Sequence, residues 1–219
     1  MSPDSNSLFD FSAKAVGYDR WYETPEGRAH DLAQKADVVK MIGSSGNGRR
    51  LLDVGCGTGH WSRFFSSLGF NVYGIDVSPE MLSVAKSSSP SSITFLHGEA
   101  GNLPFDNETF DMAASMATLE FISDASLALR EMSRCVKRGG TILIGTLNRL
   151  SQLNRQRIAN GKEPYASGRL FSPDELRKLL SPFGNVRMLF SDSRSKEENS
   201  PGETDGYDSA PFIIAEVQK

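Results

Sequence analysis

Residues 51–59, LLDVGCGTG, constrain the fold of this chain more than any other stretch. The apolar residues at its start suit a central parallel strand, which is covered on both faces and need not alternate between apolar and polar positions. The glycines that follow can adopt positive φ angles, and they let a ligand approach the backbone without meeting a Cβ atom. A helix that starts at about Thr58 or Gly59 points its first unpaired N–H groups at this turn. The stretch therefore predicts a strand, a turn and a helix that together bind a ligand.

The spacing of the glycines distinguishes two classes of ligand. A dinucleotide-binding turn has the pattern G-x-G-x-x-G. Gly55 and Gly57 match it, but His60 occupies the third position. The turn instead has an acid, Asp53, before alternating glycines, which fits a ligand with a cationic amino-acid end and no pyrophosphate. An NAD(P)-dependent oxidoreductase stays the alternative.

Four stretches of the chain resemble one enzyme family. Residues 53–59 resemble the first motif of class I S-adenosylmethionine (SAM)-dependent methyltransferases, of the methyltransferase type 11-like kind. Residues 97–105 are similar to the family's third-strand loop, with Glu99 in place of an aspartate, and residues 110–111 and 137–140 resemble two strand entries. The resemblance spans residues 11–217 and is stronger on the cofactor side than on the acceptor side.

The pattern of apolar runs and breaks predicts an α/β chain. The expected strands cover residues 51–54, 71–76, 93–96, 110–116, 141–147, 185–190 and 212–217. No helix separates the last two, so the last strand should run antiparallel to its predecessor. The resemblance implies a Rossmann-like seven-stranded sheet of order 3-2-1-4-5-7-6 with helices on both faces.

The helices follow from periodicity and caps. They are expected over residues 28–42, from about 58 to 69, from 78, over 124–137, and from 172 to 184. In the first of these, Leu32, Ala36, Val39 and Ile42 recur at helical spacing and predict its apolar face.

The length of 219 residues fits a single methyltransferase domain, residues 1–219. Within it the resemblance implies an N-terminal helical lid (11–42), a SAM-binding core (49–147), an acceptor-side cap (148–171) and a C-terminal helix and hairpin (172–219). Residues 1–10 should be frayed, and residues 191–209 should form a mobile hairpin loop.

The start of the lid allows two interpretations. It is either an amphipathic helix that lays Phe11, Val16 and Trp21 on the sheet edge, or a cover whose Tyr18 and Tyr22 close over a ligand.

Composition excludes several classes of function. The net charge of −3 provides no basic stripe for nucleic acid, and no apolar run is long enough for a membrane span. The start of the sequence has no secretory signal pattern, which predicts a cytoplasmic protein. The two cysteines, Cys56 and Cys135, should be free thiols, and no metal spacing is present. A monomer or homodimer without metal is expected.

Asp76 ends the second expected strand, where a carboxylate can accept both ribose hydroxyls of an adenosine. Ser78 and Pro79 already begin the next helix as cap and first residue, so Asp76 is free for a ligand. The resemblance implies the following SAM-binding residues: Tyr18, Asp53, Gly55, Cys56, Gly57, Asp76, Val77, Met81, Glu99, Ala100 and Met116.

The acceptor side is less determined. Residues 148–171 carry Arg149, Arg155, Arg157, Lys162 and Arg169, which either meet an anionic acceptor or form a solvated face. Substrate contacts are predicted for Tyr22, Tyr165 and Arg169.

The sequence has no Ser/His/Asp set, zinc spacing or paired carboxylates that chemistry would require. Glu120 is the one candidate general base, with a surface acid as its alternative interpretation, and His30, His60 and His97 are expected to be structural. The prediction is a methyltransferase that transfers a methyl group from SAM to a small molecule by in-line displacement and releases S-adenosylhomocysteine. A non-catalytic SAM-binding module is the second alternative.

Overall fold

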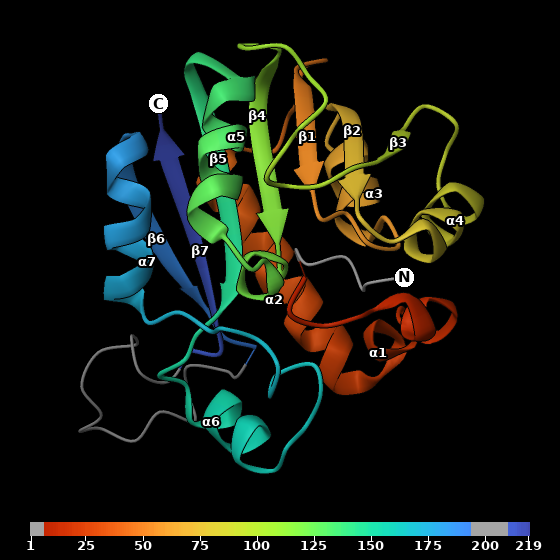
Figure 1. Ribbon diagram of the computed structural model, residues 1–219, viewed down its shortest axis with the longest axis vertical. Coiled ribbons are helices and arrows are strands. Elements are labelled where there is room, and N and C mark those ends of the chain that lie inside the picture. The colour runs from red at the N-terminus through yellow and green to blue at the C-terminus, as the bar shows by residue number, and fades with distance from the viewer. Residues whose placement is uncertain (1–6, 194–209) are drawn as a thin grey trace.

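The computed structural model describes residues 7–193 and 210–219, and in these residues seven strands form one sheet of order β3-β2-β1-β4-β5-β7-β6 (Figure 1). The strands are β1 (Arg50–Val54), β2 (Asn71–Asp76), β3 (Thr94–His97), β4 (Phe110–Met116), β5 (Val136–Leu147), β6 (Asn185–Ser191) and β7 (Phe212–Gln218). β7 pairs antiparallel with both β5 and β6, and the other neighbours pair parallel. The predicted sheet order and the antiparallel last strand are confirmed.

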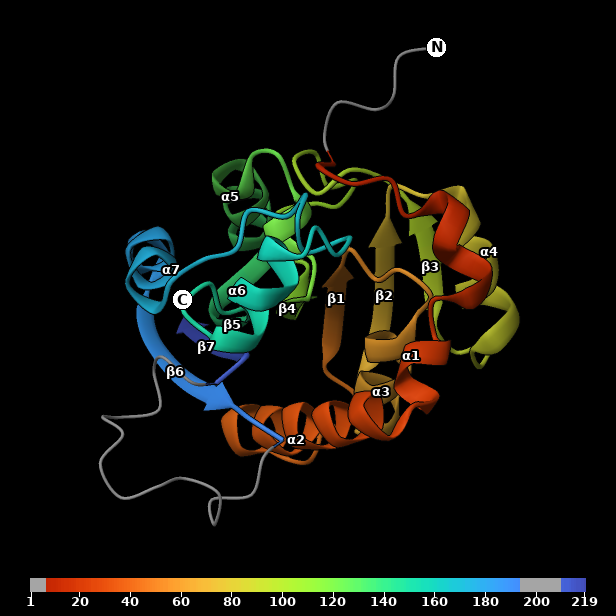
Figure 2. The same cartoon turned by 90° about the horizontal axis from the view of Figure 1, so that it is seen from below.

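Helices cover both faces of this sheet. The α-helices are α1 (Arg20–Glu23), α2 (Pro25–Ile42), α3 (His60–Ser67), α4 (Pro79–Ser88), α5 (Ala125–Cys135), α6 (Gln152–Ala159) and α7 (Pro173–Leu180). Short 3-10 helices are η1 (Ser12–Gly17), η2 (Leu119–Phe121) and η3 (Ser181–Phe183). Seen from below, α2 and α3 lie on one side of the sheet and α5 and α7 on the other (Figure 2).

Each face of the sheet has its own apolar core. On one face Phe65 of α3 and Val38 of α2 pack against strand residues such as Leu51. On the other, Met132 of α5 and Leu176 of α7 pack against the opposite side of the same strands. Burial on both faces explains why β1 and β4 do not alternate regularly between apolar and polar residues.

The carboxyl ends of the parallel strands meet at one edge of the sheet. In Figure 1 the arrowheads of β1, β2 and β4 point down toward α1 and α6, whereas β7 points up. In α/β sheets ligands bind outside this edge. The topology therefore brings the turn after β1, the end of β2 and the N-terminal helices to one place.

The structure corrects the predicted apolar face of α2. This helix begins at Pro25, where the Thr24 hydroxyl accepts a hydrogen bond from the Gly27 amide, and Leu32 is 68% exposed. Its buried residues include Val38 and Met41 instead. The reason is that α2 packs on the antiparallel pair β6 and β7, whose position the local periodicity could not indicate.

The structure also corrects the predicted boundary between α5 and β5. The helix ends at Cys135 and the strand begins at Val136, although residues 137–140 were expected to end the helix and separate it from the strand. Val136 pairs with Phe110, and a register shift follows before regular pairing with β4 resumes. Residues 137–140, whose glycines predict a turn, therefore belong to the irregular first part of β5.

The N-terminal segment differs in two ways from what the sequence predicts. Val16 is 88% exposed rather than packed on the sheet edge, and Ser7 forms a bridge with Ile122 rather than fraying. The predicted hairpin loop over 191–209 lies outside the described residues from 194 on, as do residues 1–6. Both cysteines are free, as predicted.

Within residues 7–193 and 210–219, none of the helices combines the length and the apolar character that crossing a membrane requires.

Candidate functional site

The glycine turn after β1 has the predicted left-handed backbone. The amides of Gly55 and Cys56 both donate to the Ile75 carbonyl of β2, at 2.8 and 3.0 Å. Gly55 has φ +73°, and a Cβ there would overlap the Thr118 side chain. Gly57 has φ +52°, and a Cβ there would meet nothing within 4 Å. Gly55 therefore serves close packing, whereas Gly57 leaves open space beside the backbone.

Two buried carboxyl groups flank this turn. Asp53 of β1 is 1% exposed and accepts a hydrogen bond of 2.6 Å from the Ser62 hydroxyl. Its burial, and secondarily the nearby Asp76, raises the Asp53 pKa to about 7, although the Ser62 hydrogen bond opposes the shift. Two acids so close together suit a cationic ligand group, which would favour their charged forms.

Asp76 reaches across from the end of β2. Its Oδ2 accepts from the Gly57 amide at 2.8 Å and its Oδ1 from the Ser78 amide at 2.9 Å. Burial raises the pKa of Asp76. The cap of α4 is the Ser78 hydroxyl, which accepts from the Met81 amide, as the sequence predicted. The structure corrects the expectation that Asp76 is free, because its carboxylate bonds both the turn and the amide of the residue that caps α4.

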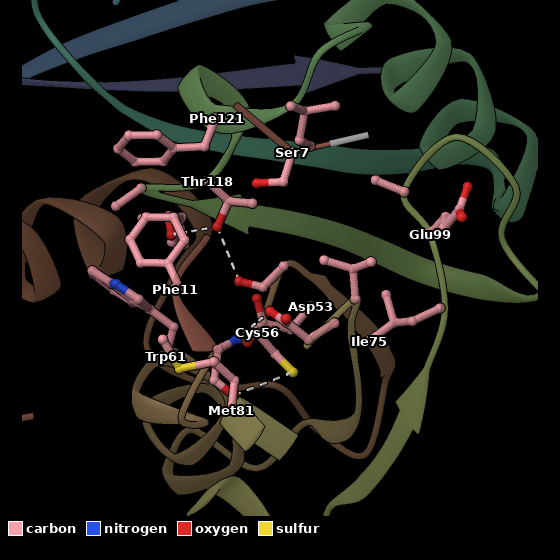
Figure 3. Close-up of a pocket in the computed structure, with 18 of the residues that line it drawn as sticks. Ser7, Phe11, Asp53, Cys56, Trp61, Ile75, Met81, Glu99, Thr118 and Phe121 are labelled. Atoms are coloured by element: carbon pink, nitrogen blue, oxygen red, sulfur yellow. Dashed lines mark hydrogen bonds between the residues drawn. The ribbon is translucent and has the colours of Figure 1, made fainter. Parts of the chain in front are cut away.

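These residues line one cavity, which we call the turn cavity (Figure 3). All eleven residues predicted to bind SAM lie in its lining: Tyr18, Asp53, Gly55, Cys56, Gly57, Asp76, Val77, Met81, Glu99, Ala100 and Met116. In Figure 3 Glu99 and Ile75 lie at one end, and Trp61 and Phe121 at the other. The cavity is thus elongated across the ends of the strands.

The charges of the turn cavity have one sign. Among the described residues that line it, the acids are Asp53, Asp76, Glu99 and Asp124, and there is no lysine or arginine. Sequence reasoning missed Asp124, which caps α5 by accepting from the Leu127 amide. Its place in the sequence could have indicated this, because it begins the helix that follows β4, near the carboxyl edge of the sheet.

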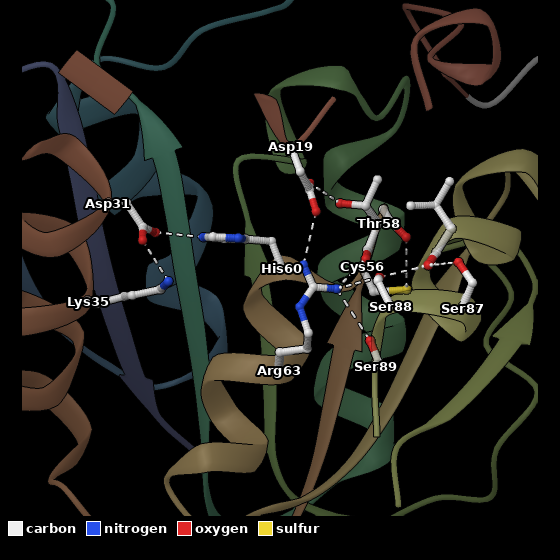
Figure 4. Close-up of polar contacts among 12 residues, drawn as sticks. Asp19, Asp31, Lys35, Cys56, Thr58, His60, Arg63, Ser87, Ser88 and Ser89 are labelled. Atoms are coloured by element: carbon white, nitrogen blue, oxygen red, sulfur yellow. Dashed lines mark hydrogen bonds and ion pairs between the residues drawn. The ribbon is translucent and has the colours of Figure 1, made fainter. Parts of the chain in front are cut away.

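The N-terminal segment is bound to the glycine turn by ionic contacts (Figure 4). Asp19, between η1 and α1, accepts from the Thr58 hydroxyl at 2.5 Å and pairs with Arg63 at 3.0 Å. His60, the first residue of α3, contacts Asp31 of α2 at 2.7 Å, and Tyr22 stacks on its ring with centroids 3.7 Å apart. These contacts hold Tyr18 and Tyr22 over the site.

A second cavity, which we call the cap cavity, lies between the N-terminal helices and the segment around α6. Its volume of about 460 Å³ lies within the roughly 300–1,000 Å³ that is typical of ligand pockets, whereas the volume of the turn cavity is about 130 Å³. It shares five lining residues with the turn cavity: Tyr18, Tyr22, Trp61, Ala117 and Phe121. The two cavities therefore meet at these residues, which we call the junction.

Comparison with known proteins identifies the family. Residues 52–144 match the family model described as a methyltransferase domain. The chain is 30% identical over 173 residues to the malonyl-(acyl-carrier protein) O-methyltransferase of Hamiltonella defensa, over 74% of this chain and 66% of that enzyme. The chain belongs to the class I SAM-dependent methyltransferase family. SAM is the cosubstrate of this family.

Two further relatives agree with this methyltransferase assignment. The demethylmenaquinone methyltransferase of Staphylococcus aureus is 36% identical over 132 residues, which cover 58% of this chain and 54% of that enzyme. A crystal structure of a SAM-dependent methyltransferase from Thermotoga maritima has a TM-score of 0.71 and 28% identity, and the match covers 95% of this chain and 97% of that one. The chain spans about half to two thirds of the length of the two curated enzymes.

The acceptor residues predicted for this methyltransferase have different positions. Tyr22 and Tyr165 line the cap cavity. Arg169 is exposed, lies outside the lining of both cavities, and donates its amide to the Glu120 carbonyl at 2.7 Å. Arg157 is one of the cations for which the sequence allows either an anionic acceptor or a solvated face. It is 9% exposed and lines the cap cavity.

Glu120 is a buried group rather than a surface acid. Its carboxylate accepts from the Thr146 hydroxyl at 2.9 Å and from the Leu147 amide at 3.2 Å. Burial raises its pKa to about 7. It is part of neither cavity lining, so its carboxylate ties η2 to the end of β5.

Proposed function

We propose that this chain binds SAM in the turn cavity and transfers the methyl group to a small-molecule acceptor in the cap cavity. The observation that carries the proposal is the open space beside Gly57, bordered by the carboxylates of Asp53 and Asp76. A ligand with a ribose and a cationic amino-acid end matches this combination of backbone and acids.

The residues along the turn cavity suggest the direction in which SAM lies. Glu99, Ala100, Val77 and Met81 would surround the adenine, and Asp76 would accept from the ribose hydroxyls. Asp53 would face the ammonium group, while the methionine portion would lie along the backbone of the turn. The sulfonium end would then lie near Met116, next to the junction with the cap cavity.

In SAM the methyl group is bonded to a sulfonium sulfur. The acceptor attacks the methyl carbon in line, and the sulfur is the leaving group. The chain has to hold the nucleophile in line and close to that methyl, which is where proximity contributes most to the rate. Tyr18, Tyr22 and Phe121 at the junction would exclude water from the reacting atoms. Because the acceptor occupies a separate cavity, its reacting atom has to reach the methyl group through this junction.

Two features of the site weaken the oxidoreductase alternative. The third glycine of a dinucleotide turn is replaced by His60, whose side chain is held by Asp31 and stacked on Tyr22. A pyrophosphate would also meet a cavity whose described lining contains acids and no lysine or arginine.

The test is a calorimetric titration of the full chain with SAM, S-adenosylhomocysteine and NADH, followed by transfer assays. We expect micromolar binding of the first two and none of NADH. Labelled SAM incubated with pooled small metabolites should then yield labelled small products. Tight binding of NADH alone contradicts the proposal, and SAM binding without transfer to any pool supports the non-catalytic module.

A further inference from the structure

The two joined cavities carry opposite charge. The described lining of the turn cavity has four carboxylic acids and no lysine or arginine. The cap cavity has Lys14, Arg157 and Lys162, and its one carboxylate, on Glu163, accepts from the Ser167 hydroxyl at 2.9 Å. A cationic cosubstrate suits the first cavity, and an anion suits the second.

Arg157 is the buried cation of the cap cavity. Its Nη1 donates to the Asn154 side chain at 3.3 Å, and its Nη2 pairs with Glu26 at 3.0 Å. Its guanidinium lies over the Tyr165 ring, 4.6 Å from the centroid. These contacts fix the guanidinium plane, which is the condition for bidentate recognition of a carboxylate.

The ion pair with Glu26 leaves other N–H groups of the Arg157 guanidinium available to a ligand. The Glu26 side chain is 60% exposed and lies outside the cavity lining, whereas the Arg157 side chain is 9% exposed and lies in it. Solvent screens the exposed carboxylate. The remaining guanidinium N–H groups have no partner in the part of the chain that the structure describes, so they can donate to a ligand.

Aromatic side chains line the cap cavity between Arg157 and the junction. Trp21, Tyr165 and Phe212 line the cap cavity, and Tyr18 and Tyr22 complete it at the junction. The hydroxyls of the three tyrosines have no hydrogen-bond partner among residues 7–193 and 210–219. Burial raises the pKa of each tyrosine, so the three phenols stay protonated and can donate to an acceptor.

We infer that the acceptor is an aromatic carboxylic acid whose carboxylate binds Arg157 and whose oxygen or nitrogen nucleophile lies among the junction tyrosines. This inference rests on the proposed function. In the transfer, a lone pair of the nucleophile bonds to the methyl carbon and the carbon–sulfur bond breaks. The electron pair stays on sulfur, which gives S-adenosylhomocysteine. The proton of the nucleophile leaves through the cap cavity, whose exposed residues Lys162 and Glu163 border solvent.

The test compares two probes of the same shape that differ in charge. Full-length protein saturated with S-adenosylhomocysteine is titrated calorimetrically with 3,4-dihydroxybenzoate and with 3,4-dihydroxybenzamide. We expect the acid to bind at least about tenfold more tightly, because it alone makes charge-assisted hydrogen bonds.

Two variants test whether Arg157 causes the preference for the acid over the amide. Arg157→Gln should abolish the preference for the acid and leave the affinity for S-adenosylhomocysteine unchanged. Arg155 is an exposed arginine on the same helix. Arg155→Gln should keep both the preference for the acid and the affinity for S-adenosylhomocysteine. Thermal melts check that each variant is folded, and the comparison of the two probes on the unaltered chain does not depend on any variant.

The outcomes separate the two proposals. Equal binding of acid and amide, or binding of neither at millimolar concentration, overturns the inference while SAM binding stands. Tighter binding of the cationic probe dopamine also overturns it. Failure to bind S-adenosylhomocysteine overturns the proposed function itself.

Discussion

At the scale of single residues, Asp76 connects the glycine turn to the start of α4. Its two oxygens accept from the Gly57 and Ser78 amides. Replacing the carboxylate with a methyl group removes its charge and both acceptors. Asp76→Ala should weaken binding of S-adenosylhomocysteine by about 1.5–3 kcal/mol, the magnitude of hydrogen bonds to a charged group.

Calorimetry measures this affinity. The control is Asp106→Ala, because Asp106 is an exposed acid just before β4, at the opposite edge of the sheet. Unchanged affinity in Asp76→Ala would show that the carboxylate only braces the turn.

The two glycines of the turn should respond differently to alanine. Gly57→Ala introduces a Cβ into open space at φ +52°, and a left-handed alanine costs roughly 1 kcal/mol. We expect this variant to fold but to lose most of its affinity for SAM, since the Cβ occupies ligand space. Gly55→Ala should lose much more stability, because its Cβ would overlap Thr118.

Urea unfolding and calorimetry on both variants check this contrast. Normal SAM binding by Gly57→Ala would mean that the ligand does not lie along this backbone.

At the scale of elements, the contact between the N-terminal helices and the glycine turn depends on Asp19. This one carboxylate accepts from Thr58 and pairs with Arg63, while the side chain is 33% exposed. Asp19→Ala should raise hydrogen exchange in η1 and α1 and weaken SAM binding several-fold, because Tyr18 and Tyr22 lose their support.

Asp37→Ala provides a matched control, since it removes an ion pair with an exposed lysine within α2. Hydrogen exchange followed by mass spectrometry should show no change in η1 for this control. Equal exchange in both variants would mean that aromatic packing alone holds the N-terminal helices.

At the scale of the whole molecule, three buried acids, Asp53, Asp76 and Glu120, have raised pKa values that shape how stability depends on pH. Burial raises the pKa values of Asp53 and Glu120 to about 7. The folded state then keeps protons that the unfolded chain has lost, so their stabilisation is complete below about pH 4 and disappears as pH rises through 7. Asp31 and Asp111 have lowered pKa values and lose stabilisation only under more acidic conditions.

The free energy of unfolding should therefore fall between about pH 4 and pH 7, by up to about 1.4 kcal/mol per pH unit for each group. Urea titrations at several pH values measure it. Glu120→Gln, which mimics the protonated acid, should flatten the curve, whereas Glu23→Gln at an exposed position should leave it unchanged. A curve that is flat for the unaltered chain contradicts this account.

The sequence predicted those parts of the molecule that depend on neighbouring residues. The strand and turn at 51–59, the Ser78 cap and the sheet order were all correct. The eleven proposed SAM residues converge on one cavity, because the carboxyl ends of parallel strands share an edge. Strand propensity, glycine conformation and cap chemistry act over a few residues, so a sequence reveals them.

Tertiary structure alone decided the features that depend on distant partners. Leu32 is exposed because α2 packs on β6 and β7 through another face, and β5 begins at Val136 because that residue pairs with Phe110. Arg157 pairs with Glu26, which is 131 residues away along the chain. Burial and charge pairing arise from contacts between remote segments, and no local pattern records which segments will meet.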